Sequence, residues 1–132
     1  MSDEAVDAFA EFKKSSNATT YLIFHIVNKA KIEVESQSED KDFATFLSAL
    51  PADDGRYGVY KRDFTTTDGR AGTKLVFIAW APDSSPVRTK MLYAGSKAAL
   101  GSVLVGVGIK ITATDTSELT EEILDEACRK FA

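Results

Sequence analysis

The order of the apolar runs limits this chain to a mixed sheet covered by helices. Four runs with strand character form two close pairs, 21–26 with 31–35 and 57–64 with 74–80. Such pairs favour antiparallel hairpins, with turns at Asn28-Lys29 and around Asp68-Gly69 and Gly72. A fifth run, 107–112, follows a long helical stretch that starts at Ser85-Pro86 and reaches about Val105, near Gly106 and Gly108. A helical connection of that length allows the fifth strand to lie parallel to its neighbour.

Three shorter helices complete the pattern, over residues 3–14, 42–50 and 121–131. Ser2 is suited to cap the first helix, whose expected buried stripe is Val6, Phe9 and Ala10. Pro51 ends the second helix, and Thr120 caps the last. The order αββαββαβα therefore predicts an α+β fold, with one mixed five-stranded sheet and helices on both of its faces.

Length and composition fit one domain over residues 1–132. The chain is 44% hydrophobic, enough for a core without covalent staples. Its one cysteine, Cys128, excludes an internal disulfide and suits a reducing compartment. The N-terminus lacks a signal-peptide pattern, and the apolar-rich run 98–111 is too short to span a bilayer. We therefore expect a cytoplasmic monomer.

The charge is unevenly distributed along the chain. The net charge is −4, yet residues 56–97 hold eight basic and three acidic residues, a net charge of +5. An acidic total argues against a general nucleic-acid binder, whereas a basic middle allows a local patch for an acidic partner. The alternative is a set of merely solvated faces, which is the interpretation we favour for Arg56, Lys61 and Arg62.

No residue pattern nominates a catalytic centre. His25, the only histidine, lies in a strand expected to be buried, and Cys128 lies on the packing side of a helix. The acidic clusters at 39–42 and 53–54 lack the spacing of a calcium loop, and no phosphate-binding glycine motif is present. We expect neither enzyme activity nor a metal or cofactor; a small acid–base enzyme ranks far below a binding protein.

The long helix has two apolar faces. Leu92, Tyr93 and Leu100 lie on the face expected to pack on the sheet. The opposite face carries small or apolar residues, edged by bases: Val87, Met91, Ala94, Ala98 and Gly101, with Arg88, Lys90 and Lys97 beside them. Either this second face is exposed for a partner's groove, or the helix is buried on both faces.

Residues 80–100, W-A-P-D-S-S-P-V-R-T-K-M-L-Y-A-G-S-K-A-A-L, resemble the signature of the actin-depolymerising factor/cofilin family. Weaker similarity covers most of the chain, including Ser2-Asp3-Glu4, Leu50-Pro51 and Thr114-Asp115. The resemblance implies the fold derived above. It also implies a protein that binds actin monomers and filaments, prefers ADP-bound subunits, and promotes filament severing and depolymerisation.

The resemblance also implies which residues contact actin. Arg88 and Lys90 match the family's essential basic pair. Met91 and Ala94 match its cleft-facing positions, which Lys97 and Ala98 continue. The flanking contacts are expected from Ser2, Asp3, Ser117 and Glu118. Phosphorylation of Ser2 would add negative charge and oppose binding to an acidic surface.

On the filament side the resemblance implies contacts from Lys74, Asp125 and Arg129. This set of contacts is smaller than the family's, because Gly72 occupies a position where the family has a base and Glu126 one where a base is common. A mainly monomer-sequestering protein is therefore the alternative function. Gly101 and Ser102 replace a later basic cluster of the long helix, which weakens the expected binding of phosphoinositides.

Overall fold

The computed structural model describes residues 3–14, 18–28, 31–103, 107 and 109–130, with the side chains at 98–99 and 101–103 excepted. The predicted Ser2 cap, the Lys29 half of the first turn, and the helix end near Gly106 and Gly108 lie outside these residues. Asn28, the other half of that turn, has a φ of 53°, in the left-handed region that asparagine tolerates.

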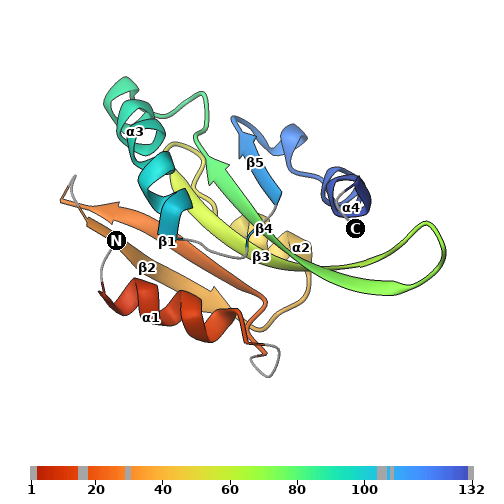
Figure 1. The fold of residues 1–132 in the computed structure, drawn as a ribbon. Coiled ribbons are helices and arrows are strands. Elements are labelled where there is room, and N and C mark those ends of the chain that lie inside the picture. The colour runs from red at the N-terminus through yellow and green to blue at the C-terminus, as the bar shows by residue number, and fades with distance from the viewer. Residues whose placement is uncertain (1–2, 15–17, 29–30, 104–106, 108, 131–132) are drawn as a thin grey trace.

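One mixed sheet of five strands organises the chain, as predicted (Figure 1). The spatial order is β2-β1-β3-β4-β5. The strands are β1 (Tyr21–Val27), β2 (Lys31–Ser38), β3 (Arg56–Thr65), β4 (Ala71–Trp80) and β5 (Ile109–Ala113). The first four pair antiparallel, and β5 lies parallel to β4 after the long helical crossover.

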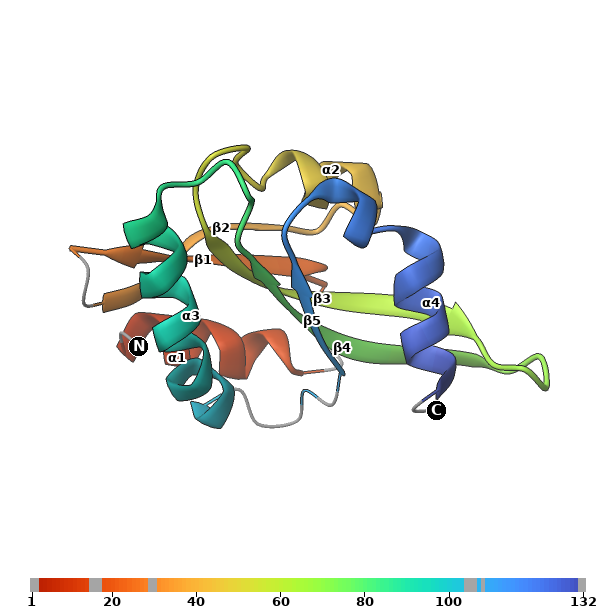
Figure 2. The ribbon, with the colours of Figure 1, turned by 90° about the horizontal axis from the view of Figure 1, so that it is seen from above.

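Helices cover both faces of the sheet. They are α1 (Asp3–Phe12), α2 (Phe43–Ser48), α3 (Val87–Val103) and α4 (Glu121–Lys130), with a short 3₁₀ helix, η1 (Thr116–Glu118), before α4. Figure 2 shows α1 and α3 together on one side of the sheet and α2 on the other. Strand alternation builds a core on each side, so that Leu22 packs with α1 and α3 while Ile23 packs with α2 and α4.

Caps fix two of the helix starts. The Asp42 carboxylate accepts a hydrogen bond from Ala44 N at 3.0 Å at the start of α2, and the Thr120 hydroxyl accepts one from Ile123 N at 3.2 Å at the start of α4. The predicted cap of α3 was wrong. The Ser85 hydroxyl donates instead to the carbonyl of Pro82 at 2.6 Å, and the helix begins at Val87.

The predicted buried stripe of α1 was wrong by one position. Its buried residues are Ala5, Phe9 and Phe12, whereas Val6 and Ala10 are exposed. The stripe is rotated because Phe12, at the last turn, also packs in the core beneath the helix.

The β3–β4 hairpin is longer than predicted and projects beyond the rest of the sheet (Figures 1 and 2). Its ladder continues to the pair Thr65 and Ala71, and Gly69, with a φ of 87°, lies in the turn. Gly72 was expected in that turn, but it pairs with Phe64 inside the ladder. A Cβ on Gly72 would lie 3.0 Å from the Phe64 ring, which accounts for a glycine there.

The prediction that three bases of β3 are merely solvated was also wrong. Arg56 binds both carboxylate oxygens of Glu35, at 3.0 and 2.9 Å, and Asp54 at 2.8 Å. Arg62 binds Asp125 at 2.8 Å, and the Lys61 Nζ lies 4.7 Å from the centre of the Phe12 ring.

His25 was predicted to be a core residue, and it is not. Its side chain is half-buried near the turn that joins β1 to β2, with Nδ1 3.4 Å from a carboxylate oxygen of Glu35. Alternation fails as a guide here because the helices do not cover this end of β1 as closely as its start, where four consecutive residues are buried.

Candidate functional site: the exposed face of helix α3

Helix α3 is anchored to the sheet through Tyr93. The ring of Tyr93 lies 5.0 Å from that of Tyr57, and its hydroxyl accepts a hydrogen bond from Ile26 N at 3.0 Å. The Tyr57 hydroxyl donates to the Tyr93 carbonyl, and burial raises the pKa of Tyr57, which keeps this donor protonated. Gly55 lies so close that a Cβ on it would be 2.5 Å from Cδ2 of Tyr93.

The opposite face of α3 is exposed over the described residues. Val87 and Met91 are each 70% exposed, and Ala94 is exposed beside them. Arg88 is exposed and Lys90 is half-buried. The interpretation that the helix is buried on both faces is therefore wrong for residues 87–94. The side chain of Ala98, predicted to continue the face, lies outside the description.

Lys97 is held in place by a neighbouring strand. Its Nζ donates to the hydroxyl of Thr112 on β5 at 2.5 Å. This bond positions Lys97, one of the three predicted bases, at the edge of the face. The Lys97 side chain is half-buried.

A hollow opens beside the first turns of α3. Arg88, Met91 and Leu92 line one wall, and Ile26, Asn28 and Asp54 line the other. These last three residues were missed from the sequence, because they come from the end of β1 and the loop before β3 and carry no motif. Only the fold brings them beside the helix.

The segment before α3 ties two loops to the start of the helix. The Trp80 indole donates to the Pro51 carbonyl at 2.7 Å, and the Ser84 hydroxyl donates to the Ala52 carbonyl at 2.5 Å. Asp83 N donates to the Thr114 carbonyl at 3.1 Å. The last bond holds the loop before η1 next to the segment that leads into α3.

The flanking residues Ser117 and Glu118 are exposed but locally bonded. Ser117 donates from its backbone N to the Asp115 carboxylate at 2.8 Å, and Glu118 accepts from Thr114 N at 3.0 Å. Hydrogen bonds from Thr114 lower the pKa of Glu118, and those from Ser117 lower the pKa of Asp115, so both carboxylates stay charged. Asp3, the other predicted flank, is exposed at the start of α1, on the same side of the sheet as α3, and Ser2 lies outside the described residues.

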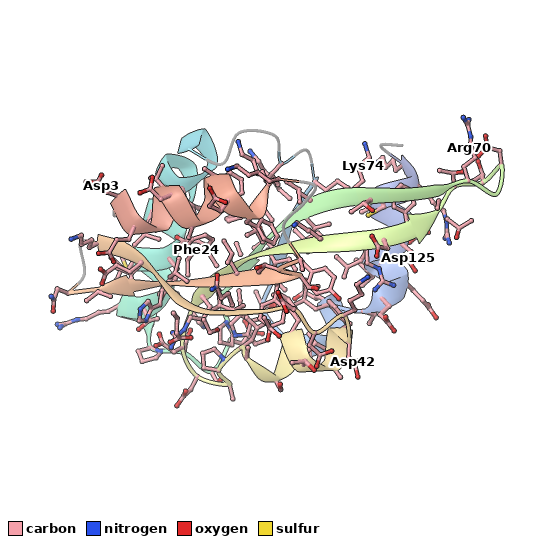
Figure 3. The ribbon with its side chains drawn as sticks, turned by 90° about the horizontal axis from the view of Figure 1, so that it is seen from below. Asp3, Phe24, Asp42, Arg70, Lys74 and Asp125 are labelled. Carbon is pink, nitrogen blue, oxygen red and sulfur yellow. The ribbon has the colours of Figure 1, made fainter. Side chains whose placement is uncertain are left out.

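The predicted filament-side residues gather where α4 packs on the long hairpin. Figure 3 shows Lys74 on the long hairpin, Asp125 where α4 lies against it, and Arg70 at the tip of the hairpin. Asp125 binds Arg62 through both carboxylate oxygens, at 2.8 and 3.1 Å, and Arg129 donates to the Thr65 carbonyl at 3.0 Å. The hydrogen bonds between Arg62 and Asp125 raise the pKa of Arg62. The role of Arg62 in holding α4 to the hairpin was missed from the sequence.

Within the part of the chain that the structure describes, the other chemistry is sparse. No group of three or more histidine, cysteine or acidic side chains could hold a metal ion. Cys128 is buried, and burial raises the pKa of its thiol, which disfavours a nucleophilic thiolate. No described helix is long and apolar enough to cross a membrane.

A long helix on a mixed sheet, with an exposed apolar face edged by bases, is typical of a small protein-binding domain. Comparison with known proteins identifies the family. The sequence profile of "Cofilin/tropomyosin-type actin-binding protein" matches residues 1–129. The chain therefore belongs to the cofilin/actin-depolymerising factor family, whose members are non-enzymatic actin-binding proteins.

Individual relatives are similar over nearly their whole length. The cofilin of Schizosaccharomyces pombe is 40% identical over 98% of this chain and 95% of the relative. Actin-depolymerizing factor 8 of Arabidopsis thaliana is 37% identical over 94% of this chain and 89% of the relative. The crystal structure of Streptomyces griseoflavus cofilin superposes with a TM-score of 0.87 at 35% identity, covering 96% of this chain and 95% of that one.

Proposed function

We propose that this protein binds actin, as monomer and filament, by docking the exposed face of α3 into an apolar cleft of the actin subunit. One observation carries the proposal. Two large apolar side chains, Val87 and Met91, are each 70% exposed on a helix whose other face packs Tyr93 and Leu100 into the core. Exposed apolar side chains rimmed by charge are typical of a protein interface.

The chemistry of the face divides into two parts. Burying the Met91 and Val87 side chains in a cleft would contribute about 1.5–3 kcal/mol each. Arg88 and Lys90 would meet acidic groups on the rim, which orients the complex and speeds its formation. Asp3, Ser117 and Glu118 would contact actin on the two flanks.

The direct test is co-sedimentation with actin filaments. Wild-type protein should raise the unsedimented fraction of actin, and Arg88→Ala with Lys90→Ala should lose that effect. Lys13→Ala with Lys41→Ala is the matched control, because it also removes two positive charges. Neither residue lies on α3 or lines the hollow beside the first turns of α3. Equal activity of the Arg88/Lys90 variant and wild type would refute the site.

Filament severing and depolymerisation would follow from unequal binding. A protein that binds a twisted, weakened filament state, or an ADP-bound subunit, better than other states shifts the population toward it without catalysis. We place this action at the actin cytoskeleton of the cytoplasm, with the protein acting as a monomer. A phosphate on Ser2 would oppose docking by adding negative charge beside an acidic partner.

A mainly monomer-sequestering function is the second candidate. It is favoured by the internal bonds of Asp125 and Arg129, which leave fewer donors and acceptors for a second actin subunit. Lys74 remains at the base of the hairpin, while Gly72 carries no charge. Equal affinity for filaments and monomers would contradict this candidate, and affinity for monomers alone would support it.

A further inference from the structure

The hollow beside the first turns of α3 carries a negative charge on its far wall. Its apolar lining comes from Ile26 and Leu92, which are half-buried, and from the buried Tyr93. Among the described residues that line it, Asp54 is the only acid and Arg88 the only base. Within the described part of the chain no ion pair joins these two side chains, so the two walls keep opposite charges on either side of an apolar lining.

The Asp54 carboxylate is held in place by its neighbours. Its Oδ1 accepts a hydrogen bond from Gly55 N at 2.8 Å, and its Oδ2 accepts one from Nη1 of Arg56 at 2.8 Å. Arg56 is itself anchored, because it binds both carboxylate oxygens of Glu35 on β2, at 3.0 and 2.9 Å, and the Gly55 carbonyl at 2.6 Å. This wall is therefore preformed, and little conformational entropy is lost when a partner binds there.

The negative charge of Asp54 is only partly neutralised. One guanidinium, that of Arg56, serves two carboxylates, and it meets Glu35 through two hydrogen bonds but Asp54 through one. Each carboxylate oxygen has more than one lone pair, so the Asp54 carboxylate can accept further hydrogen bonds. Its side chain is 46% exposed, which leaves these acceptor positions within reach of a docked partner.

We propose that Asp54 binds a lysine or arginine side chain of the actin subunit that docks on α3, and that the aliphatic stem of that side chain packs on Ile26 and Leu92. This inference rests on the proposed function, because the hollow is continuous with the face of α3: Met91 and Arg88 belong to both. Long basic side chains bury their stems on apolar surface while their charged ends meet an acid.

Other occupants fit this hollow less well. An acidic side chain would be repelled by the Asp54 carboxylate. A purely apolar side chain would cover that carboxylate and remove water from it without supplying a hydrogen-bond donor, which costs free energy. A base with a long aliphatic stem satisfies both the apolar lining and the acid.

A direct ion pair and long-range attraction make opposite predictions for the loss of this acid. If actin were attracted only through the bases that edge α3, removing an acid from a protein of net charge −4 would leave binding unchanged or strengthen it. An ion pair at Asp54 requires instead that its removal weakens binding. The sign of the change therefore decides between the two.

Dissociation constants for monomeric actin test the ion pair in Asp54→Asn and Asp53→Asn. Both variants remove one negative charge from the same loop, but Asp53 is exposed and is not among the described residues that line the hollow. Asp54→Asn should bind about tenfold more weakly than wild type, and Asp53→Asn should bind at least as tightly as wild type. Thermal denaturation checks that both variants are folded. Equal affinity of Asp54→Asn and wild type, or equal weakening in both variants, would overturn the proposal.

Two further measurements separate a lost ion pair from other causes. The weakening by Asp54→Asn should shrink as salt is raised, because a half-exposed ion pair is screened; a weakening that persists unchanged would indicate a distorted loop and count against the pair. Arg88→Ala with Lys90→Ala, measured in the same series, tests the proposed docking face itself. If that variant binds weakly while Asp54→Asn binds as wild type does, the α3 site stands and only this inference fails.

Discussion

Met91 belongs to a surface, whereas Leu100, nine residues further along the same helix, belongs to the core. Met91 is 70% exposed and Leu100 is 1% exposed. The two residue types are similar in size and apolarity, so their positions on the two faces of the helix separate their roles. A change at one should act on binding and a change at the other on stability.

Met91→Ala should weaken actin binding by about tenfold, because it removes an apolar anchor from the centre of the docking face. Its free energy of unfolding should change by less than about 0.5 kcal/mol, because the side chain packs on little. Leu100→Ala should instead cost about 2–5 kcal/mol. Denaturant titration and a monomer-binding assay measure the two effects; a strongly destabilised Met91→Ala would contradict this division.

Two glycines near α3 should respond in opposite directions to alanine. In Gly55→Ala the new Cβ would lie 2.5 Å from Cδ2 of Tyr93, so the ring must shift and the protein should lose about 1–3 kcal/mol. In Gly95→Ala the new Cβ meets nothing within 4 Å, and the helix should gain up to about 1 kcal/mol. Thermal denaturation compares them, and a neutral Gly55→Ala would show that Tyr93 is not clamped.

At the level of elements, α4 is attached to the long hairpin by one ion-pair cluster. Arg62, only 13% exposed at its side chain, contacts Asp125 at 2.8 Å and Glu121 at 3.1 Å. Asp125→Asn should destabilise the protein by about 1–3 kcal/mol, since it weakens a charged hydrogen-bonded pair that is partly buried. Glu121→Gln, at the exposed edge of the cluster, should cost less than about 1 kcal/mol.

Urea titration of these two variants gives the comparison, and amide hydrogen exchange in α4 shows whether the loss is local. Equal destabilisation by both variants would mean that burial of Asp125 does not matter. A stable Asp125→Asn with weakened filament binding would instead support its predicted contact role.

Much of the element pattern was predictable because it depends on local periodicity. Alternation and hairpin spacing predicted all five strands and the two antiparallel hairpins, and Thr120 was correctly predicted to cap α4. The pairing of β1 with β3 was not predicted. Local patterns do not report partners that are distant in sequence. Arg56 pairs with a residue 21 positions away and Arg62 with one 63 positions away, so both were misread as solvated bases.

The candidate site was predictable on α3 and not beyond it. Helical geometry placed Val87, Met91 and Arg88 on one face, and the structure leaves that face exposed. The far wall of its hollow, formed by Ile26, Asn28 and Asp54, depends on tertiary packing and has no sequence signal.

At the scale of the whole molecule, the basic middle of the sequence is not one patch. Arg56 and Arg62 hold the structure together through internal ion pairs. Arg88, Lys90 and Lys97 edge the proposed docking face of α3. A protein of net charge −4 with three bases along its proposed docking face is suited to approach an acidic partner in one orientation.

The central claim, that the exposed face of α3 is the actin site, is tested most directly by the dissociation constant for monomeric actin. It should be measured for wild type, for Arg88→Ala with Lys90→Ala, and for the matched Lys13→Ala with Lys41→Ala. The account predicts that the first variant binds about tenfold or more weakly, while the second binds as wild type does. Equal affinity of all three proteins would contradict it.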